Sequence, residues 1–381
     1  MITTRRIKEA VSSVSLHHTD PRRLLHAAIT PDRTDNPENL IQMKIKKIVK
    51  TVVTSAVVLL AIASLAACGE VKRGEYTSGT GAVFCEDGFK NILDEEIAAF
   101  EFEYKEAHIL PFYMSEQACI DSLLADKCQS IIITRDFTKE ERQHCKSVNR
   151  RIVRSNCIAV DAVAMIVNKD NPVSALSMDE IGKILRGEIS RWDQLAGNDT
   201  TAIKVVFDSE GSSTVAYMRD KFLPEGKKIT DYIKPYAQKN NAAVFDVVKN
   251  DPDALGIISV SWLGNDLSVA QKVPMDQRME QYADENDSIN TELTSEVNII
   301  KVSNPCEDND FSPVAYKPYQ LYINSGDYPL FRKVWMISTA SNSTMLHSFY
   351  TFVTGFVGQK IIIKSGIMPY HVNRRVVQLV K

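Results

Sequence analysis

The chain has 381 residues, of which 44% are hydrophobic and 24% charged. This balance excludes a disordered or fibrous protein and leaves enough apolar residues for a buried core in two domains. The 45 Lys and Arg residues against 48 Asp and Glu residues give a net charge of −3. An acidic chain is not expected to bind nucleic acid, which requires a basic surface.

Residues 43–67 are predicted to form a signal peptide. An apolar run at 52–63, too short to span a bilayer comfortably, follows four lysines and precedes the small residues before Cys68. The stretch Leu65-Ala66-Ala67-Cys68-Gly69 resembles a bacterial lipobox, which predicts a lipid on the Cys68 thiol and a mature chain that begins there. The alternatives are a buried helix or an uncleaved anchor.

Residues 1–42 are polar and precede the methionine of this complete signal. We therefore hypothesise that Met43 is the true start and that 1–42 are a mis-assigned upstream extension. Residues 68–77 are polar and glycine-containing, as expected of a tether. Without residues 1–67, which carry ten basic and five acidic residues, the remaining 35 basic and 43 acidic residues give a net charge of −8.

The first half of the mature chain alternates between predicted strands and helices. A strand at 82–85 precedes a helix whose apolar residues recur over 93–104, and a second helix around 120–124 precedes the β-branched strand 130–134. Another apolar strand is expected at 160–168. Ser177 and Glu180 then form a capping box for a helix that Gly187 ends. This alternation predicts a parallel sheet flanked by helices.

The second half continues the pattern as far as residue 260. Strands are expected at 203–207, 256–260 and 334–338, with helices at 215–222 and 244–248. The acidic stretch 276–295 shows little periodicity and is expected to be a surface excursion. One long amphipathic helix is expected to end near Ser365-Gly366. A chain of this length predicts two α/β lobes rather than one domain.

The loop Asp208-Ser209-Glu210-Gly211-Ser212-Ser213-Thr214 lies between a predicted strand and a predicted helix. Glycine permits a tight turn, hydroxyls donate hydrogen bonds, and the free N–H groups of a first helical turn attract anions. Gly211, Ser212, Ser213 and Thr214 are therefore candidate oxyanion ligands. Ordinary helix capping by Ser212 or Ser213 explains the motif equally well.

Thr134, Arg135 and Asp136 follow the strand at 130–134, at the end where ligands bind in open α/β sheets. Arg135 is suited to bidentate contact with an oxyanion, and Asp136 to accepting a hydrogen bond from a protonated one. A surface pair between the two residues is an equally good explanation.

Two further strand-to-helix corners offer donors. Asp87, Gly88 and Phe89 form one corner, and Ser115 precedes the second helix. Asp87 and Ser115 are also ordinary capping residues. Four such corners together predict a binding cleft more strongly than any one of them does.

Signatures of enzymes are missing from the sequence. It contains no nucleophile elbow, Walker A loop, GxGxxG or HExxH motif. The histidines have no partner spacing, and the cysteines lack zinc spacing. We expect no catalytic activity, cofactor or metal. Scattered thiols and one or two disulfides are equally compatible with the cysteines.

Several segments resemble the PstS-like substrate-binding proteins of bacterial phosphate transporters, over about residues 78–380. They are 158–168 with Asn171-Pro172-Val173, 181–189 with Trp192, Gly211-Ser212-Ser213-Thr214, and Gly358-Gln359 followed by 365–369. The resemblance implies a type II periplasmic-binding-protein clamp with two interlobe crossings, near 157–167 and 328–338. It places residues 78–160 with 335–381 in lobe 1 and residues 161–334 in lobe 2.

The sequence departs from the family at one position that matters. The family has an arginine before its phosphate loop, whereas this chain has Asp208 within Val206-Phe207-Asp208-Ser209. Arg135 is then the candidate to supply the charge from the opposite lobe.

The resemblance implies a lipid-anchored protein of the bacterial cell envelope that captures inorganic phosphate for an ABC importer. Its implied partners are phosphate, the permease subunits, and the membrane through Cys68. Binding or sensing of another small oxyanion, such as sulfate, is an alternative. A surface phosphate-ester hydrolase is a weaker one.

Overall fold

The structure is a computed structural model that describes residues 76–195, 200–264, 271–284, 287, 292–304 and 314–371. The predicted signal peptide, the upstream extension and Cys68 lie outside these ranges. No helix within them is long and apolar enough to cross a membrane.

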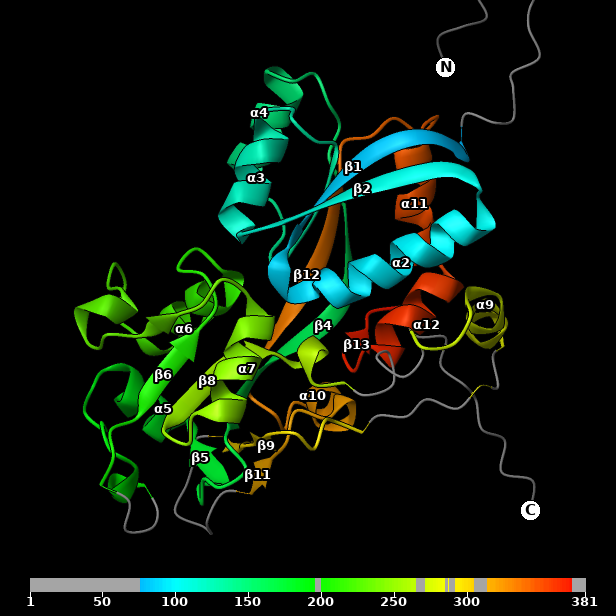
Figure 1. Ribbon diagram of the computed structural model, residues 1–381. Helices are drawn as coiled ribbons and strands as arrows, with labels where there is room; N and C mark the ends of the chain where they lie inside the picture. Colours follow the sequence, from blue (N-terminus) through cyan, green and yellow to red (C-terminus); the bar gives the residue numbers. More distant parts are fainter. Residues whose placement is uncertain are drawn as a thin grey trace, which may run out of the picture. The chain divides into compact units, whose positions relative to one another are not determined.

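The main sheet combines parallel and antiparallel strands (Figure 1). The path β2-β1-β3-β12-β4-β8-β6-β7 orders its strands, and β9 and β13 each pair with β4. β1 is parallel to β2 and β3, and β6 is parallel to β7 and β8, whereas β12 and β4 run antiparallel to their neighbours. The strands are β1 (Ser78–Glu86), β2 (Glu106–Met114), β3 (Ser130–Ile133), β4 (Arg154–Val167), β6 (Lys204–Phe207), β7 (Tyr236–Ala237), β8 (Ala254–Ser259), β9 (Asn298–Ile299), β12 (Phe331–Ser338) and β13 (Met368–Pro369).

A small second sheet has the order β11-β10-β5. Its strands are β5 (Ala175–Ser177), β10 (Lys301–Ser303) and β11 (Ala315–Tyr316).

β4 joins the two parallel groups of strands. Its first half pairs with β12 and its second half with β8, so one 14-residue strand belongs to both groups. The pairing with β12 shifts register between Val334 and Trp335, where Ile158 is the additional residue on β4. The carbonyl of Ile158 accepts a hydrogen bond from the Tyr370 N–H at 3.0 Å.

Helices cover both groups of strands. α11 packs on β1, and α12 packs on α2, so the C-terminal segment lies with the N-terminal strands (Figure 1). The α-helices are α2 (Lys90–Glu103), α3 (Glu116–Leu124), α4 (Lys139–Ser147), α5 (Met178–Leu185), α6 (Ser213–Phe222), α7 (Asn241–Asn250), α9 (Met275–Ala283), α10 (Gln320–Ser325), α11 (Met345–Thr354) and α12 (Phe356–Lys364). Short 3₁₀ helices are η1 (Asp87–Phe89), η2 (Trp192–Gln194), η3 (Ile229–Asp231) and η4 (Val260–Trp262).

The predicted fold class is confirmed, because the structure is a mixed α/β sheet with helices. The predicted capping box is also present, with Ser177 and Glu180 bonding each other's backbone at the start of α5. Gly187 follows this helix with a φ of +71°, a conformation that favours glycine. β2 and α4 were not predicted.

The prediction of a surface excursion at 276–295 did not include the helix that its first part forms. Residues Met275–Ala283 form α9, and Tyr282 is fully buried although its helix is polar. The Tyr282 hydroxyl donates to Glu95 Oε1 at 2.8 Å, and Arg278 pairs with the same carboxylate. Polar contacts with Glu95 of α2 therefore hold α9, a helix that has little apolar periodicity.

The predicted single C-terminal helix is two helices, α11 and α12, separated at Gly355. The ψ of Gly355 is −178°, so the backbone is extended between the helices. Three residues later, a Cβ on Gly358 would lie 2.6 Å from the backbone of Phe352 and Val353. The close approach of α12 to the end of α11 requires glycine there.

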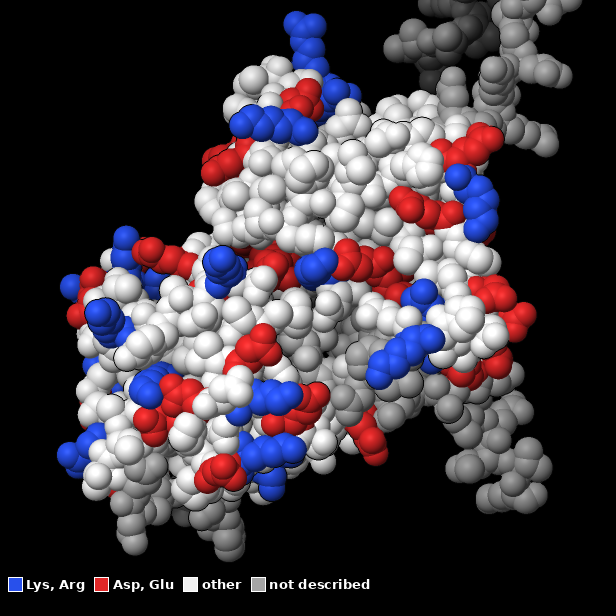
Figure 2. All heavy atoms as spheres, viewed as in Figure 1, with Lys and Arg blue, Asp and Glu red and all other residues white. Residues whose placement is uncertain are grey.

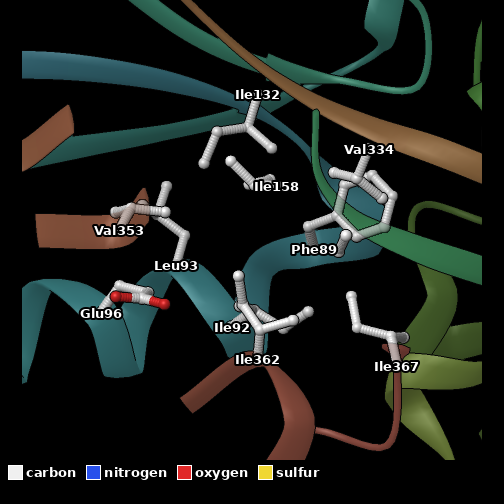
Figure 3. A pocket seen from close by; sticks show the side chains of 11 residues that line it. Phe89, Ile92, Leu93, Glu96, Ile132, Ile158, Val334, Val353, Ile362 and Ile367 are labelled. Atoms are coloured by element: carbon white, nitrogen blue, oxygen red, sulfur yellow. The ribbon is translucent and has the colours of Figure 1, made fainter. Parts of the chain in front are cut away.

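A small apolar cavity lies in the core between α2, α12 and the strands β3, β4 and β12 (Figure 3). Leu93, Ile132, Val334 and Ile362 are among its lining residues. Glu96 from α2 is 1% exposed, and both of its carboxylate oxygens lack a hydrogen-bond partner. Burial, together with the neighbouring Glu95, raises the pKa of Glu96 well above its ordinary value.

Because the fold favours the protonated form of Glu96, its ionisation opposes folding once the pH exceeds the unfolded pKa of about 4.3. We therefore expect Glu96→Gln to raise the melting temperature relative to the wild type at pH 8 but not at pH 4. Thermal unfolding at both pH values measures this. Glu103→Gln, at an exposed position of the same helix, is the control. Equal shifts for both variants at pH 8 would contradict the prediction.

Candidate functional site

The corner after β1 places a carboxylate at the start of a helix. Glu86 is fully buried, and its Oε2 accepts a hydrogen bond from the Gly88 N–H at 2.8 Å. The Gly88 carbonyl accepts bonds from Ser261 Oγ at 2.8 Å and Trp262 Nε1 at 3.0 Å. Asp87 Oδ2 accepts the backbone N–H of Asn241 at 3.3 Å. This corner therefore contacts η4 and the beginning of α7.

The corner at Ser115 meets the loop before α6. Ser115 caps α3, and its Oγ lies 3.4 Å from the Ala118 nitrogen. A Cβ built on Gly211 would lie 3.3 Å from Ser115 Cβ and 3.4 Å from Ser115 Oγ. The two predicted site segments, far apart in sequence, are thus in contact.

The Ser212 hydroxyl of the loop before α6 is engaged by a protein group. Ser212 caps α6, and its hydroxyl donates to Asp208 Oδ1. Asp208 Oδ2 accepts from the Asn241 side-chain amide at 3.0 Å. Asp208, Ser212 and Asn241 are all buried. The buried Asp208 carboxylate is therefore bound by groups that donate to anions.

The corner after β3 divides into two parts. The Thr134 N–H and hydroxyl both donate to Glu116 Oε2 on α3, at 2.6 and 2.5 Å. Arg135 instead binds Glu141 with both terminal nitrogens, at 2.9 and 2.6 Å. Asp136 accepts the Phe137 N–H at 2.7 Å and pairs with Arg142. The guanidinium of Arg135 is thus engaged on the α4 side.

Arg332 of β12 is the cation that lies among the other corners. Its side chain is 3% exposed, and its Nε lies 3.0 Å from Asp161 Oδ2 on β4. Its Nη1 donates to Ser213 Oγ at 2.9 Å, and the guanidinium carbon lies 5.7 Å from the centre of the Phe89 ring. One buried side chain therefore contacts the corner after β1, the start of α6 and the central strand.

Sequence reasoning missed Arg332, although a signal was present. Arg332, Val334 and Met336 occupy alternate positions of β12 and are all buried. A charged residue in phase with apolar inward-facing residues is rarely buried unless it is paired or binds a ligand. Glu86, which directly precedes Asp87, was also not among the predicted ligands.

Three polar atoms of residues in this cluster lack hydrogen-bond partners. Within the described residues, Glu86 Oε1, Thr214 Oγ1 and Arg332 Nη2 are buried side-chain atoms that make no hydrogen bond. Thr214 follows Ser213, which Arg332 binds, and Arg332 acts directly on the ionisation of Glu86. Buried polar groups without partners are costly, and a bound ligand is one way to satisfy several that belong to the same cluster. These atoms are suited to a small polar ligand.

The electrostatics of the cluster follow from burial around one guanidinium. Burial raises the pKa of Glu86 to about 8, although Arg332 opposes the rise. Burial likewise raises the pKa of Asp208 to about 6 against the hydrogen bond from Ser212. Burial raises the pKa of Asp161 as well, and Arg332 again counteracts it. Several of these carboxyl groups therefore titrate above their ordinary range.

Other kinds of site are not supported in the described part of the chain. No group of three or more His, Cys, Asp or Glu residues there is arranged to hold a metal ion. The cysteines described there, Cys85, Cys119, Cys128, Cys145 and Cys157, are free and buried. On the face seen in Figure 2, acidic and basic side chains are interspersed, and the surface over β1, β2 and α3 is largely uncharged. This face has no basic patch of the kind that binds nucleic acid.

Residues 74–355 match the family described as a PBP superfamily domain. The chain belongs to the PBP superfamily. It is 23% identical over 284 residues to the phosphate-binding protein PstS of Borreliella burgdorferi, covering 73% of this chain and 85% of that protein. A PstS of Bacillus subtilis is 27% identical over 138 residues, which is 36% of this chain and 43% of that protein. The predicted resemblance to PstS-like proteins is thereby confirmed.

Solved structures of this superfamily share the fold. A protein described as a phosphate ABC transporter substrate-binding protein of Clostridium perfringens, with bound phosphate, superposes with a TM-score of 0.58. It is 19% identical and covers 77% of this chain and 100% of its own. A phosphate transport receptor of Vibrio cholerae gives a TM-score of 0.51 at 18% identity, covering 76% and 100%. At these identities the likeness establishes the fold.

The Arg332–Asp161 pair of this PBP-superfamily chain is expected to be essential for stability. Arg332→Met leaves Asp161 buried without a cation, which costs roughly 3–5 kcal/mol of unfolding free energy. Urea unfolding measures this change. Arg219→Met, which removes an exposed partner of Asp220, is the control and should cost less than about 1 kcal/mol. Similar losses for the two variants would contradict the prediction.

Proposed function

We propose that this chain is the phosphate-binding component of an ABC importer and captures inorganic phosphate between two lobes. The observation that carries the proposal is the set of orphaned buried atoms, Arg332 Nη2, Thr214 Oγ1 and Glu86 Oε1. Two of them are hydrogen-bond donors next to the first turn of α6, where the helix dipole favours an anion. The phosphate-binding relatives agree with this chemistry.

The proposed ligand contacts come from the predicted corners and from Arg332. Gly211, Ser212, Ser213 and Thr214 would supply donors from one lobe, and Asp87 to Phe89, Ser115 and Thr134 would border the ligand from the other. Arg332 takes the role of the missing family arginine, because its guanidinium lies in the cluster whereas that of Arg135 is bound by Glu141. Ligand contacts of Arg135 and Asp136 stay predictions.

The proposed lobes are residues 78–160 with 335–381 and residues 161–334. β4 and β12, which pair with each other, would be the crossings. Contacts between the corners support this division, because Ser115 meets Gly211 and Asp87 meets Asn241 across it. These contacts would hold the two lobes closed around the anion.

Thr214→Val tests the proposal with little risk to the fold, because the hydroxyl that it removes has no partner. A hydrogen bond to a charged group contributes about 1.5–3 kcal/mol, so phosphate affinity should fall roughly tenfold to a hundredfold. Calorimetric titration of phosphate, with sulfate in parallel, measures the change.

The matched control is Thr339→Val. The Thr339 hydroxyl is also buried and unpartnered, but it lies just beyond the opposite end of β12 from Arg332, roughly 23 Å along an extended strand. Its loss should leave phosphate affinity unchanged. Equal effects of the two variants, or no binding of phosphate by the wild type, would overturn the proposed site. Preferential binding of sulfate would favour the alternative oxyanion.

We also propose that the mature protein is held at the outer side of a bacterial membrane by a lipid on Cys68. Cys68→Ala should abolish lipid attachment, because no other group of the predicted signal accepts it. Detergent phase partition of the expressed full chain measures this, and the variant should move from the detergent phase to the aqueous phase. The same partition for both forms would contradict the anchor.

A further inference from the structure

The candidate site holds more negative than positive side chains. The charged groups around Glu86 come from several elements: Arg332 from β12, Asp208 from the loop after β6, and Glu116 from α3. Asp87 acts on Asp208, and Asp161 of β4 pairs with Arg332. Among these residues Arg332 is the cation, and it already binds Asp161. An anionic ligand would therefore add charge of the sign that is in excess.

Like charges at close range in a buried site repel strongly, and protonation of a carboxylate removes the repulsion. Glu86 is the carboxyl group placed for this role. Its Oε2 accepts from Gly88, whereas Oε1 is a buried oxygen that makes no hydrogen bond of ordinary geometry, although the neighbouring Ser213 hydroxyl counteracts the rise in the Glu86 pKa. A neutral carboxylic acid carries a donor O–H, whereas the carboxylate only accepts. Protonation at Oε1 would thus convert an unpaired acceptor into a third donor beside Thr214 and Arg332.

We propose that Glu86 binds the oxyanion as a neutral carboxylic acid. Its Oε1 takes a proton from solvent and keeps it while the anion is bound. The proton joins the Glu86 carboxylate to give the acid, and its O–H donates to a ligand oxygen without leaving Glu86. The inference rests on the proposed function and adds a protonation requirement to it. Burial, which favours the neutral form of Glu86, agrees with the requirement.

The requirement makes affinity dependent on pH. With a pKa of about 8 for Glu86, the competent fraction is nearly complete at pH 7 and about one tenth at pH 9. Because the pKa of Glu86 is raised in the folded protein, the protein can bind the anion at low pH and loses this ability as the pH rises through that pKa. Asp208, with a pKa of about 6, changes its charge below this range.

The experiment is calorimetric titration of inorganic phosphate into the full mature chain at pH 7 and pH 9. Phosphate itself also ionises in this range, but it does so equally for every variant. We expect the ratio of Kd at pH 9 to Kd at pH 7 to be about tenfold larger for the wild type than for Glu86→Gln. Glu106→Gln, at an exposed position on β2, should keep the wild-type ratio.

Glu86→Met provides a second neutral replacement of similar length if the glutamine variant fails to fold, and it should also show the smaller ratio. Equal ratios for the wild type and a folded Glu86 variant would overturn the role of Glu86 while leaving phosphate binding intact. No phosphate binding by the wild type at either pH would instead overturn the proposed function. The two failures are therefore distinguishable.

Discussion

The arrangement of the candidate site depends on the burial of one guanidinium. Removing Arg332 from water is costly, and Asp161 offsets the cost through a buried ion pair on the adjacent strand. Ser213 and the Phe89 ring then fix the remaining orientation of the side chain. Because β4 and β12 are paired directly, the cation has a fixed position relative to the corners around it.

The corners around this cation share one chemical theme. Each places an acidic side chain where helix N-termini or hydroxyls donate: Glu86 on Gly88, Glu116 on Thr134, and Asp208 on Ser212. Such donors are suited to anions in general, and protein carboxylates use the same geometry as a dissolved oxyanion. Local hydrogen-bond geometry, rather than net charge, therefore defines the chemistry of this site.

Much of the fold could be predicted from sequence, and much less of the site. Continuous β-branched runs predicted β3 and β8, and the spacing of Ser177 and Glu180 predicted the start of α5. These signals are local in the sequence. α9 was missed because its stability comes from distant partners, Glu95 with Arg278 and Tyr282. The contact of Ser115 with Gly211 brings two of the expected corners together. Arg332 did not, because its importance arises from residues more than a hundred positions away.

The shared strand β4 has a mechanical consequence. A flexible loop lets two bodies swing freely, but a strand hydrogen-bonded at both ends carries torsion along its length. The additional residue at Ile158 interrupts the ladder with β12, and such bulges bend and twist the strand that contains them. Motion between the two groups of strands should therefore be a limited twist about this point, with an elastic restoring force that returns the protein to one resting geometry.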